Sequence, residues 1–184
     1  SGLDLGEFNR DPAPTWLAGF SNIWRAAHKA LFECKKPIIG ALESYAINGG
    51  AALALACDLL IAGKSAFLQV GEVQIGMAAP YNMAWLSLRH SEQTMAEVAL
   101  LGDRISGTEL KKMELALQAV DDSEVLAVAR SLAARLSEYP EGGLMRIKAG
   151  LRARLEDDAD AWFDRFTQRD PVGKSPKPSS MKGR

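Results

Sequence analysis

Two adjacent glycines, Gly49 and Gly50, constrain this chain more than any other feature, because they join segments of different character. The apolar run 37–42 before them is typical of a buried strand. The alanines and leucines of 51–56 after them favour a helix. A glycine turn between strand and helix leaves N–H groups unpaired at the positive end of the helix dipole. Such a turn can bind a negatively charged oxygen, although the same glycines also suit a tight turn with close packing.

The composition is that of an ordinary globular domain. A length of 184 residues with 47% hydrophobic content is enough for one core of normal size. The net charge of −1 argues against partners such as nucleic acid or an anionic membrane. No apolar run is long enough to span a bilayer. Cys34 and Cys57 are expected to be reduced core thiols, which favours a cytoplasmic location.

Hydrophobic periodicity and turn residues predict strands interleaved with helices, followed by a helical C-terminal third. The predicted elements are a loop or strand end at 1–8, a helix that starts near 11–14 and ends at 35–37, strands at 37–42, 58–62 and 66–69, a helix at 49–57, an irregular segment at 72–85, helices at 91–101 and from 106, an extended region at 120–123, and helices at 123–137, 141–155 and 158–168. This order is typical of an α/β core with a helical annex.

The two histidines are not expected to carry chemistry. The buried face of the first long helix is predicted from apolar residues at helical spacing: Trp16, Phe20, Trp24, Ala27 and Leu31. His28 lies off this stripe and is expected at the surface, and His90 is interpreted as local structure before the next helix. Neither has a partner at metal or triad spacing, so no metal site is predicted.

Six segments in a fixed order together resemble the crotonase superfamily, also called the enoyl-CoA hydratase/isomerase family. They are SGLDL (1–5), KPIIGA (36–41), YAINGGA (45–51), ACDLLIA (56–62), EVQIG (72–76) and LGDRIS (101–106). Each segment is a weak signal alone, whereas the ordered set is specific. The resemblance implies an α/β fold with a crotonase-like ββα spiral core and a helical C-terminal annex.

The resemblance also predicts how the chain is organised. The crotonase core is expected at 1–120, a C-terminal helical region at 121–170 and a flexible tail at 171–184, which is rich in Pro, Ser, Lys and Gly. The sequence starts without Met and the family pattern extends further, so we expect the core to lack its N-terminal segment. By resemblance, the chain is expected to form a homotrimer or hexamer.

Members of this family bind acyl-CoA thioesters and polarise the thioester carbonyl with two backbone N–H groups. Carried over to this chain, one donor is Gly49 and the other is Ser1, in a turn that also contains Gly2 and Asp4. Donors fixed around a developing oxyanion contribute on the order of 3 kcal/mol each. Coenzyme A would be part of the substrate, and no separate cofactor is expected.

The carboxylates decide which reaction the family resemblance implies. Family hydratases hold a water between two glutamates, and the position of the first one is Ala52 here. The second position is Glu72, which alone can move a proton between two carbon atoms and so favours double-bond isomerisation. A solvated loop carboxylate, a hydratase with a substitute group and a catalytically silent acyl-CoA binder remain alternatives.

Other residues near these motifs are candidates for substrate binding. Asn48 stands where the family often has glycine, so its amide contacts substrate or it simply accepts a left-handed backbone. The segment 77–82 lacks the usual glycine-rich turn, which brings Tyr81 or Asn82 toward the pocket. The predicted substrate-binding residues are Gly2, Asp4, Asn48, Ala52 and Tyr81. Glu43 is a further carboxylate, expected in solvent at a strand end.

The C-terminal aromatic and basic residues each have two interpretations. Trp162, Phe163 and Phe166 suit either the core or a subunit contact that covers the neighbouring ligand. The basic tail residues suit either CoA phosphates or a solvated tail, and they are Lys174, Lys177, Lys182 and Arg184.

Overall fold

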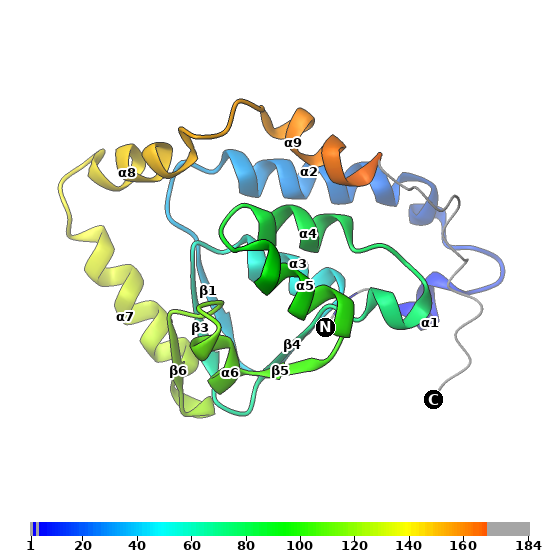
Figure 1. Cartoon of the computed structure of the whole chain (residues 1–184), viewed down its shortest axis with the longest axis horizontal. Helices are drawn as coiled ribbons and strands as arrows, with labels where there is room; N and C mark the ends of the chain where they lie inside the picture. Colours follow the sequence, from blue (N-terminus) through cyan, green and yellow to red (C-terminus); the bar gives the residue numbers. More distant parts are fainter. Residues whose placement is uncertain (1, 3, 169–184) are drawn as a thin grey trace.

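The computed structural model describes residues 2 and 4–168, and its elements interleave strands with helices (Figure 1). The helices are α1 (Leu5–Phe8), α2 (Phe20–Glu33), α3 (Gly49–Ala56), α4 (Pro80–Ser87), α5 (Glu92–Leu101), α6 (Gly107–Lys112), α7 (Val125–Ser137), α8 (Gly143–Arg152) and α9 (Ala159–Thr167). The strands are β1 (Ile39–Leu42), β2 (Tyr45–Ile47), β3 (Leu59–Gly63), β4 (Phe67–Gln69), β5 (Arg104–Ser106) and β6 (Gln118–Val120). The 3₁₀ turns are η1 (Thr15–Gly19), η2 (Glu72–Ile75) and η3 (Asp122–Glu124).

The strands form two small sheets whose order does not follow the sequence. One sheet has the parallel order β1-β3-β6, with Ile39 opposite Leu59 in its register. The other has the order β2-β4-β5, in which β2 and β4 are parallel and β5 is antiparallel. Each parallel pair is joined by a crossover rather than a hairpin, and the β2-to-β4 crossover contains α3. The expected α/β fold is therefore confirmed.

Helix α3 lies in the middle of the molecule, packed against α2, α4 and β2 (Figure 1). Its residues are small and apolar, and Ala51, Ala52, Leu55 and Ala56 are buried in the main core cluster. Small side chains allow neighbouring backbones to approach closely, so the alanines of this segment suit a helix surrounded on several sides. The core therefore fixes α3, and with it the turn at its N-terminus.

Aromatic side chains join α2, α4 and α9 into one cluster. The His28 ring is 0% exposed, and it lies 4.4 Å from the Tyr81 ring and 6.0 Å from the Phe163 ring between centroids. Its Nδ1 accepts a hydrogen bond of 2.8 Å from Nε1 of Trp85. Burial lowers the pKa of His28 to about 4, so this ring is neutral at physiological pH. The expectation of a surface histidine was wrong, because the buried face of α2 follows a four-residue spacing through His28.

Several local expectations also differ from the structure. Residues 1–8 were expected as a loop or strand end, but α1 begins at Leu5. The first long helix begins only at Phe20, after a 3₁₀ turn. The segment 72–85, expected to be irregular, contains η2 and α4, because Pro80 stands at the first helical position, where a proline is tolerated. Strand β2 was missed because its partner β4 lies about twenty residues further along the chain.

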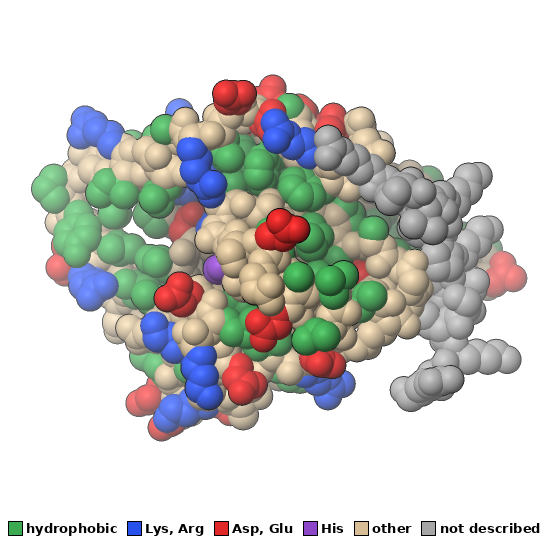
Figure 2. Space-filling view, in the orientation of Figure 1, with side chains coloured by type: hydrophobic (Ala, Val, Ile, Leu, Met, Phe, Trp, Pro, Cys, Tyr) green, Lys and Arg blue, Asp and Glu red, His purple; other side chains and the backbone are tan. Residues whose placement is uncertain are grey.

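The C-terminal helices pack on the core but leave apolar side chains exposed. Trp162 and Phe163 on α9 are buried within the chain, as the core interpretation predicts, while Phe166 is partly buried against the same core cluster. Exposed apolar residues on and beside α7 and α8 include Leu126, Tyr139, Ile147 and Leu151. On the face in Figure 2, acidic and basic side chains are interspersed. Among the described residues, no helix is long and apolar enough to cross a membrane. Residues 169–184, which include the predicted tail, lie outside the described residues.

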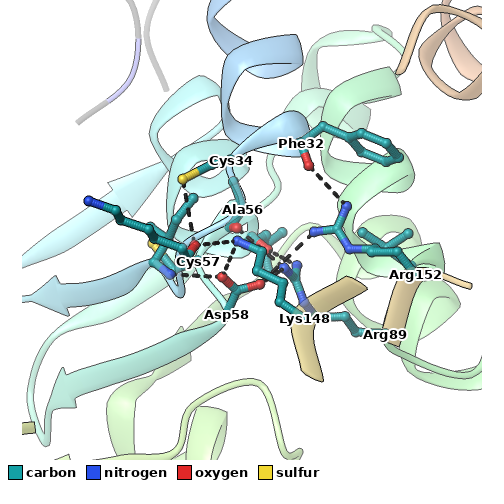
Figure 3. A network of polar contacts seen from close by, with 12 residues as sticks. Phe32, Cys34, Ala56, Cys57, Asp58, Arg89, Lys148 and Arg152 are labelled. Atoms are coloured by element: carbon teal, nitrogen blue, oxygen red, sulfur yellow. Dashed lines mark hydrogen bonds and ion pairs between the residues drawn. The ribbon is translucent and has the colours of Figure 1, made fainter. Parts of the chain in front are cut away.

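One carboxylate ties the C-terminal end of α3 to helices far away in sequence. Asp58 lies 2.6 Å from Nζ of Lys148 on α8 and 3.1 Å from Nη2 of Arg89 (Figure 3). Arg89 also donates 2.7 Å and 3.3 Å hydrogen bonds to the carbonyl oxygens of Leu55 and Ala56. These are terminal carbonyls of α3, where a cation is favoured by the helix dipole. The cluster therefore caps α3 and fastens the annex to the core.

Replacing Asp58 by Asn should lower the free energy of unfolding by about 3 kcal/mol, because it leaves the buried Lys148 and the partly buried Arg89 without their carboxylate. Burial alone would raise the pKa of Asp58, but hydrogen bonds from Lys148 and from the N of Ile38 outweigh burial and hold it below 3.8. The stabilisation is therefore complete above pH 3.8 and is lost as the pH falls through the lower folded-state pKa. Urea unfolding at pH 7 and at pH 3 measures both effects.

Asp160 provides a matched control, since it also pairs with two cations, Arg25 and Lys29, but at an exposed position. Asp160→Asn is expected to leave the unfolding midpoint nearly unchanged. Equal losses in the two variants would contradict the role given to the Asp58 cluster.

Candidate active site

Asn48 shapes the turn between β2 and α3. Its backbone has φ 50° and ψ −108°, a combination that residues with side chains rarely adopt. Three hydrogen bonds to other segments of the chain hold it there, in addition to the helical bond of 3.0 Å that its O accepts from N of Ala52. Its N donates to O of Gln69 at 2.8 Å, its Oδ1 accepts from N of Gly71 at 2.8 Å, and its O accepts from Nδ2 of Asn82 at 3.2 Å. Of the two interpretations of Asn48, its positive φ supports the left-handed backbone. The oxygen of its side-chain amide, which was the candidate for substrate contact, already accepts a hydrogen bond from Gly71.

The amide of Gly49 stands directly after this turn, at the first position of α3. Among the described residues no acceptor is bonded to this N–H, as expected for the first turn of a helix. Residue 2 lies close by, because a Cβ built on Gly2 would be 3.6 Å from N of Gly49 and 2.6 Å from O of Ile47. Glycine is therefore required at position 2 if the first residues are to reach the turn. The two segments predicted to supply oxyanion donors do converge, although Ser1 itself lies outside the described residues.

Glu72 begins η2, directly after the loop that binds Asn48. Its Oε1 accepts a 2.9 Å hydrogen bond from Nδ2 of Asn82, while its Oε2 is buried and has no partner among the residues that the structure describes. Burial raises the pKa of Glu72 to about 7, although hydrogen bonds from its own backbone and from Asn82 act in the opposite direction. A carboxyl group with this pKa is well suited to accept and return a proton near neutral pH.

The other predicted site residues lie in different surroundings. Ala52 is 1% exposed on α3, where its methyl group belongs to the core. Tyr81 lies in the first turn of α4, but its ring packs on His28, Trp24 and Phe163. Asp4 is exposed, and its Oδ1 accepts from N of Glu7 at the start of α1. Glu43 is exposed after β1, as expected. Contacts of Gly2, Asp4, Asn48, Ala52 and Tyr81 with substrate remain predictions.

The arrangement joins an unpaired amide at a helix N-terminus to a buried carboxyl group. Nδ2 of Asn82 touches both parts, since it bonds to Glu72 and to the peptide carbonyl that precedes Gly49. Together they can stabilise negative charge on a bound oxygen and move a proton a short distance away. Among the described residues, no three His, Cys, Asp or Glu side chains are grouped to hold a metal ion.

A cavity of about 360 Å³ lies at the other end of α3 rather than at Glu72. It is lined by Cys57, Asp58, Arg89, His90 and Lys111 together with apolar residues of α3, β3 and the segment after α6. Burial raises the pKa of Cys57 to about 11, so its thiol is protonated and is not an activated nucleophile. The chemistry-bearing groups therefore lie at the N-terminal end of α3.

Comparison with known proteins identifies the family of this chain. The profile of the family described as "Enoyl-CoA hydratase/isomerase" matches residues 1–168, most of the chain. The chain belongs to this family. The suspected crotonase superfamily is thereby confirmed, and the match includes both the Gly49 turn and Glu72.

Similar curated proteins include both isomerases and hydratases. The chain is 29% identical over 168 residues to 1,2-epoxyphenylacetyl-CoA isomerase of Escherichia coli K12, covering 89% of this chain and 64% of that protein. It is 27% identical over 157 residues to a probable mitochondrial enoyl-CoA hydratase of Dictyostelium discoideum, covering 85% and 56%. The chain thus spans less than two thirds of the length of these relatives.

Solved structures show the same fold. An enoyl-CoA hydratase/isomerase from Mycobacterium paratuberculosis superposes with a TM-score of 0.78 at 26% identity, covering 90% of this chain and 67% of that chain. An enoyl-CoA hydratase from Mycobacterium marinum has a TM-score of 0.76 at 24% identity, covering 91% and 74%. The crotonase-like fold expected from the sequence is therefore confirmed.

Two variants of Asn48 separate the strain of the turn from its side-chain hydrogen bond. Both Asn48→Ala and Asn48→Gly lose the bond to Gly71, but only glycine adopts a positive φ without strain. We therefore expect Asn48→Gly to be more stable than Asn48→Ala by about 1 kcal/mol. Chemical denaturation of the two variants measures this difference. Equal stabilities would show that the φ of Asn48 is not strained.

Proposed function

We propose that this chain catalyses double-bond isomerisation of an enoyl-CoA through a thioester enolate, with Glu72 as its single acid/base. The observation that supports this most directly concerns Glu72. Its buried Oε2 has no partner in the described part of the chain, and its Oε1 is joined through Asn82 to the turn that presents the Gly49 amide. The substrate would be an acyl-CoA thioester. Coenzyme A enters as part of the substrate, and the proposed reaction needs no separate cofactor.

The proposed reaction moves one proton and one double bond. The ionised Glu72 removes a proton from the α carbon of a β,γ-enoyl-CoA, and the electrons of that bond form an enolate. The enolate oxygen is stabilised by the Gly49 N–H and a second main-chain donor from the segment around residue 2. The protonated Glu72 then delivers its proton to the γ carbon, which leaves the double bond between the α and β carbons. The carboxylate is regenerated, so one group is sufficient.

The nature of residue 52 favours isomerisation over hydration. A second carboxylate would be needed to share the water of a two-glutamate mechanism, and Ala52 has only a buried methyl group. In the proposed mechanism Glu72 is therefore the single proton-transferring group.

Hydration is a second candidate, favoured by one further observation. Oδ1 of Asn82 and Oε2 of Glu72 are both buried acceptors for which residues 2 and 4–168 provide no partner, and they belong to a hydrogen-bonded pair of side chains. A water molecule with its two hydrogens satisfies two such acceptors. The amide oxygen of Asn82 would then replace the missing carboxylate in holding that water, with Glu72 as the only proton donor and acceptor.

Replacing Glu72 by Gln removes the proton-transferring group and keeps its size. Turnover of a β,γ-enoyl-CoA, followed by absorbance of the conjugated product, should fall about a hundredfold or more. Glu43→Gln is the matched control, since Glu43 is exposed, and it should keep wild-type turnover. Unchanged isomerisation by Glu72→Gln would refute the proposal.

The wild-type chain distinguishes the remaining functions. Faster hydration of crotonyl-CoA than isomerisation of its β,γ isomer would replace the isomerase proposal with hydration. Binding of an acyl-CoA in calorimetry, with neither reaction detectable, would identify a catalytically silent binder instead.

The pH dependence of kcat/KM should report the ionisation of Glu72. The general base must be a carboxylate, and burial raises the pKa of Glu72 to about 7. Activity should therefore be low at pH 5 and rise tenfold per pH unit until it levels off above pH 7. A profile already flat at pH 5 would mean that an ordinary exposed carboxylate, or no carboxylate, limits the reaction.

A further inference from the structure

Asn82 is buried at the centre of the candidate site, with 2% of its surface exposed. Its Nδ2 donates to Oε1 of Glu72 at 2.9 Å and to O of Asn48 at 3.2 Å. The peptide oxygen of Asn48 can only accept hydrogen bonds, so the nitrogen of the Asn82 amide must face it. The orientation of this amide is thereby fixed by a neighbour that does not titrate.

Both hydrogens of this nitrogen are used in linking two parts of the site. One goes to the carboxyl group of Glu72, and the other goes to the peptide unit that contains the N of Gly49. Because Oε1 of Glu72 is held by Asn82, Oε2 is the oxygen that no other described residue binds. The arrangement therefore selects which oxygen of the carboxyl group exchanges protons.

We propose that Asn82 is a positioning residue, which holds the carboxylate of Glu72 at a fixed place relative to the oxyanion-binding amide of Gly49. The inference deepens the proposed function and rests on it. Asn82 acts through Glu72 and the turn, so its loss should affect the proton-transfer step rather than the binding of coenzyme A.

The electrostatic surroundings of Glu72 make this effect measurable. The titratable residues on the neighbouring helices are Tyr81 on α4 and Glu92 and Glu97 on α5, while α3 contains none. None of them contributes to the shift of the Glu72 pKa, which comes from burial and from hydrogen bonds donated by its own backbone and by Asn82. Removing the Asn82 donor therefore withdraws one of the few interactions that stabilise the carboxylate.

The test uses Asn82→Ala, which deletes the donor, and Asn82→Asp, which keeps the shape. In Asn82→Ala the rising limb of the pH profile of kcat/KM should move upward by about one unit, since a hydrogen bond to a charged group is lost. At pH 7 kcat should fall at least roughly fivefold from ionisation alone, with KM little changed. In Asn82→Asp two neighbouring carboxyl groups share a proton and should titrate in two separate steps.

A second measurement does not depend on turnover. The chain labelled with carboxyl-¹³C glutamate gives a titration curve for each side chain, and the signal of Glu72 is the one missing in Glu72→Gln. The midpoint of this signal should move upward in Asn82→Ala. Gln74→Ala is the matched control, because Gln74 is a residue of η2 whose side-chain amide donates to O of Gly102 instead of to Glu72, and it should leave the midpoint unchanged.

The outcomes separate the two proposals. If the wild-type chain is an active isomerase and Asn82→Ala changes neither its pH profile nor the Glu72 midpoint, the positioning role is overturned and the isomerase proposal stands. A Glu72 midpoint that moves upward in a chain without isomerase activity supports the Asn82–Glu72 arrangement and refutes the proposed function. A folded Asn82→Asp variant with an unshifted Glu72 signal also overturns the positioning role.

Discussion

The hydrogen bonds around Asn48 are the constraint on which the site depends. This residue holds a positive φ because a strand end, a loop amide and a helix side chain each bind a different atom of it. Without these bonds the backbone would relax toward ordinary φ values, and the N–H of Gly49 would turn away. Asn48 is thus held by Gly71, which directly precedes Glu72, and by Asn82, which also binds Glu72. The Gly49 amide and the Glu72 carboxyl group therefore cannot move independently.

The two ends of α3 are treated differently by the surrounding protein. At the C-terminus, Arg89 donates hydrogen bonds to the terminal carbonyl oxygens of α3. Asp58 forms ion pairs with Arg89 and with Lys148 on α8. At the N-terminus the Gly49 amide has no acceptor among the described residues. A helix whose negative end is neutralised and whose positive end is open favours an anion at that open end. The Asp58 cluster thus caps one end of α3 and leaves the other end, at Gly49, as the one that favours a negative charge.

The sequence predicts the long helices and the central strands because their signals are local. Ser91 and Gly102 bound α5 as cap residues, and Ser106 with Glu109 begins α6 as a capping box. Ser91, Gly102, Ser106 and Glu109 act within one turn of the backbone, so no tertiary information is needed. The residues that were missed depend on contacts between distant segments. His28 is buried against rings of α4 and α9, and the short strand β2 pairs with β4, about twenty residues further along the chain.

The site was predictable in its motifs but not in its internal connections. Gly49 and Glu72 follow from ordered sequence segments, and the structure brings their surroundings together through Asn82. The sequence predicted only that Tyr81 or Asn82 lies near the pocket. It could not predict the bond from Asn82 on α4 to the peptide oxygen of Asn48, because no pattern in one sequence reveals a contact between a helix side chain and a distant loop. The pKa of Glu72 likewise depends on burial, which is a property of the folded chain.

The way the annex is attached has a consequence for how this protein can be divided. Helix α9 covers the aromatic faces of α2 and α4, and Lys148 on α8 completes the charge cluster at Asp58. Removing residues 121–168 would expose the aromatic side chains of α2 and α4 and would also deprive Asp58 of its ion pair with Lys148. The core and the annex should therefore unfold as one cooperative unit. A fragment cut near residue 120 would therefore resemble a partly folded intermediate, prone to self-association through the uncovered rings, rather than a smaller enzyme.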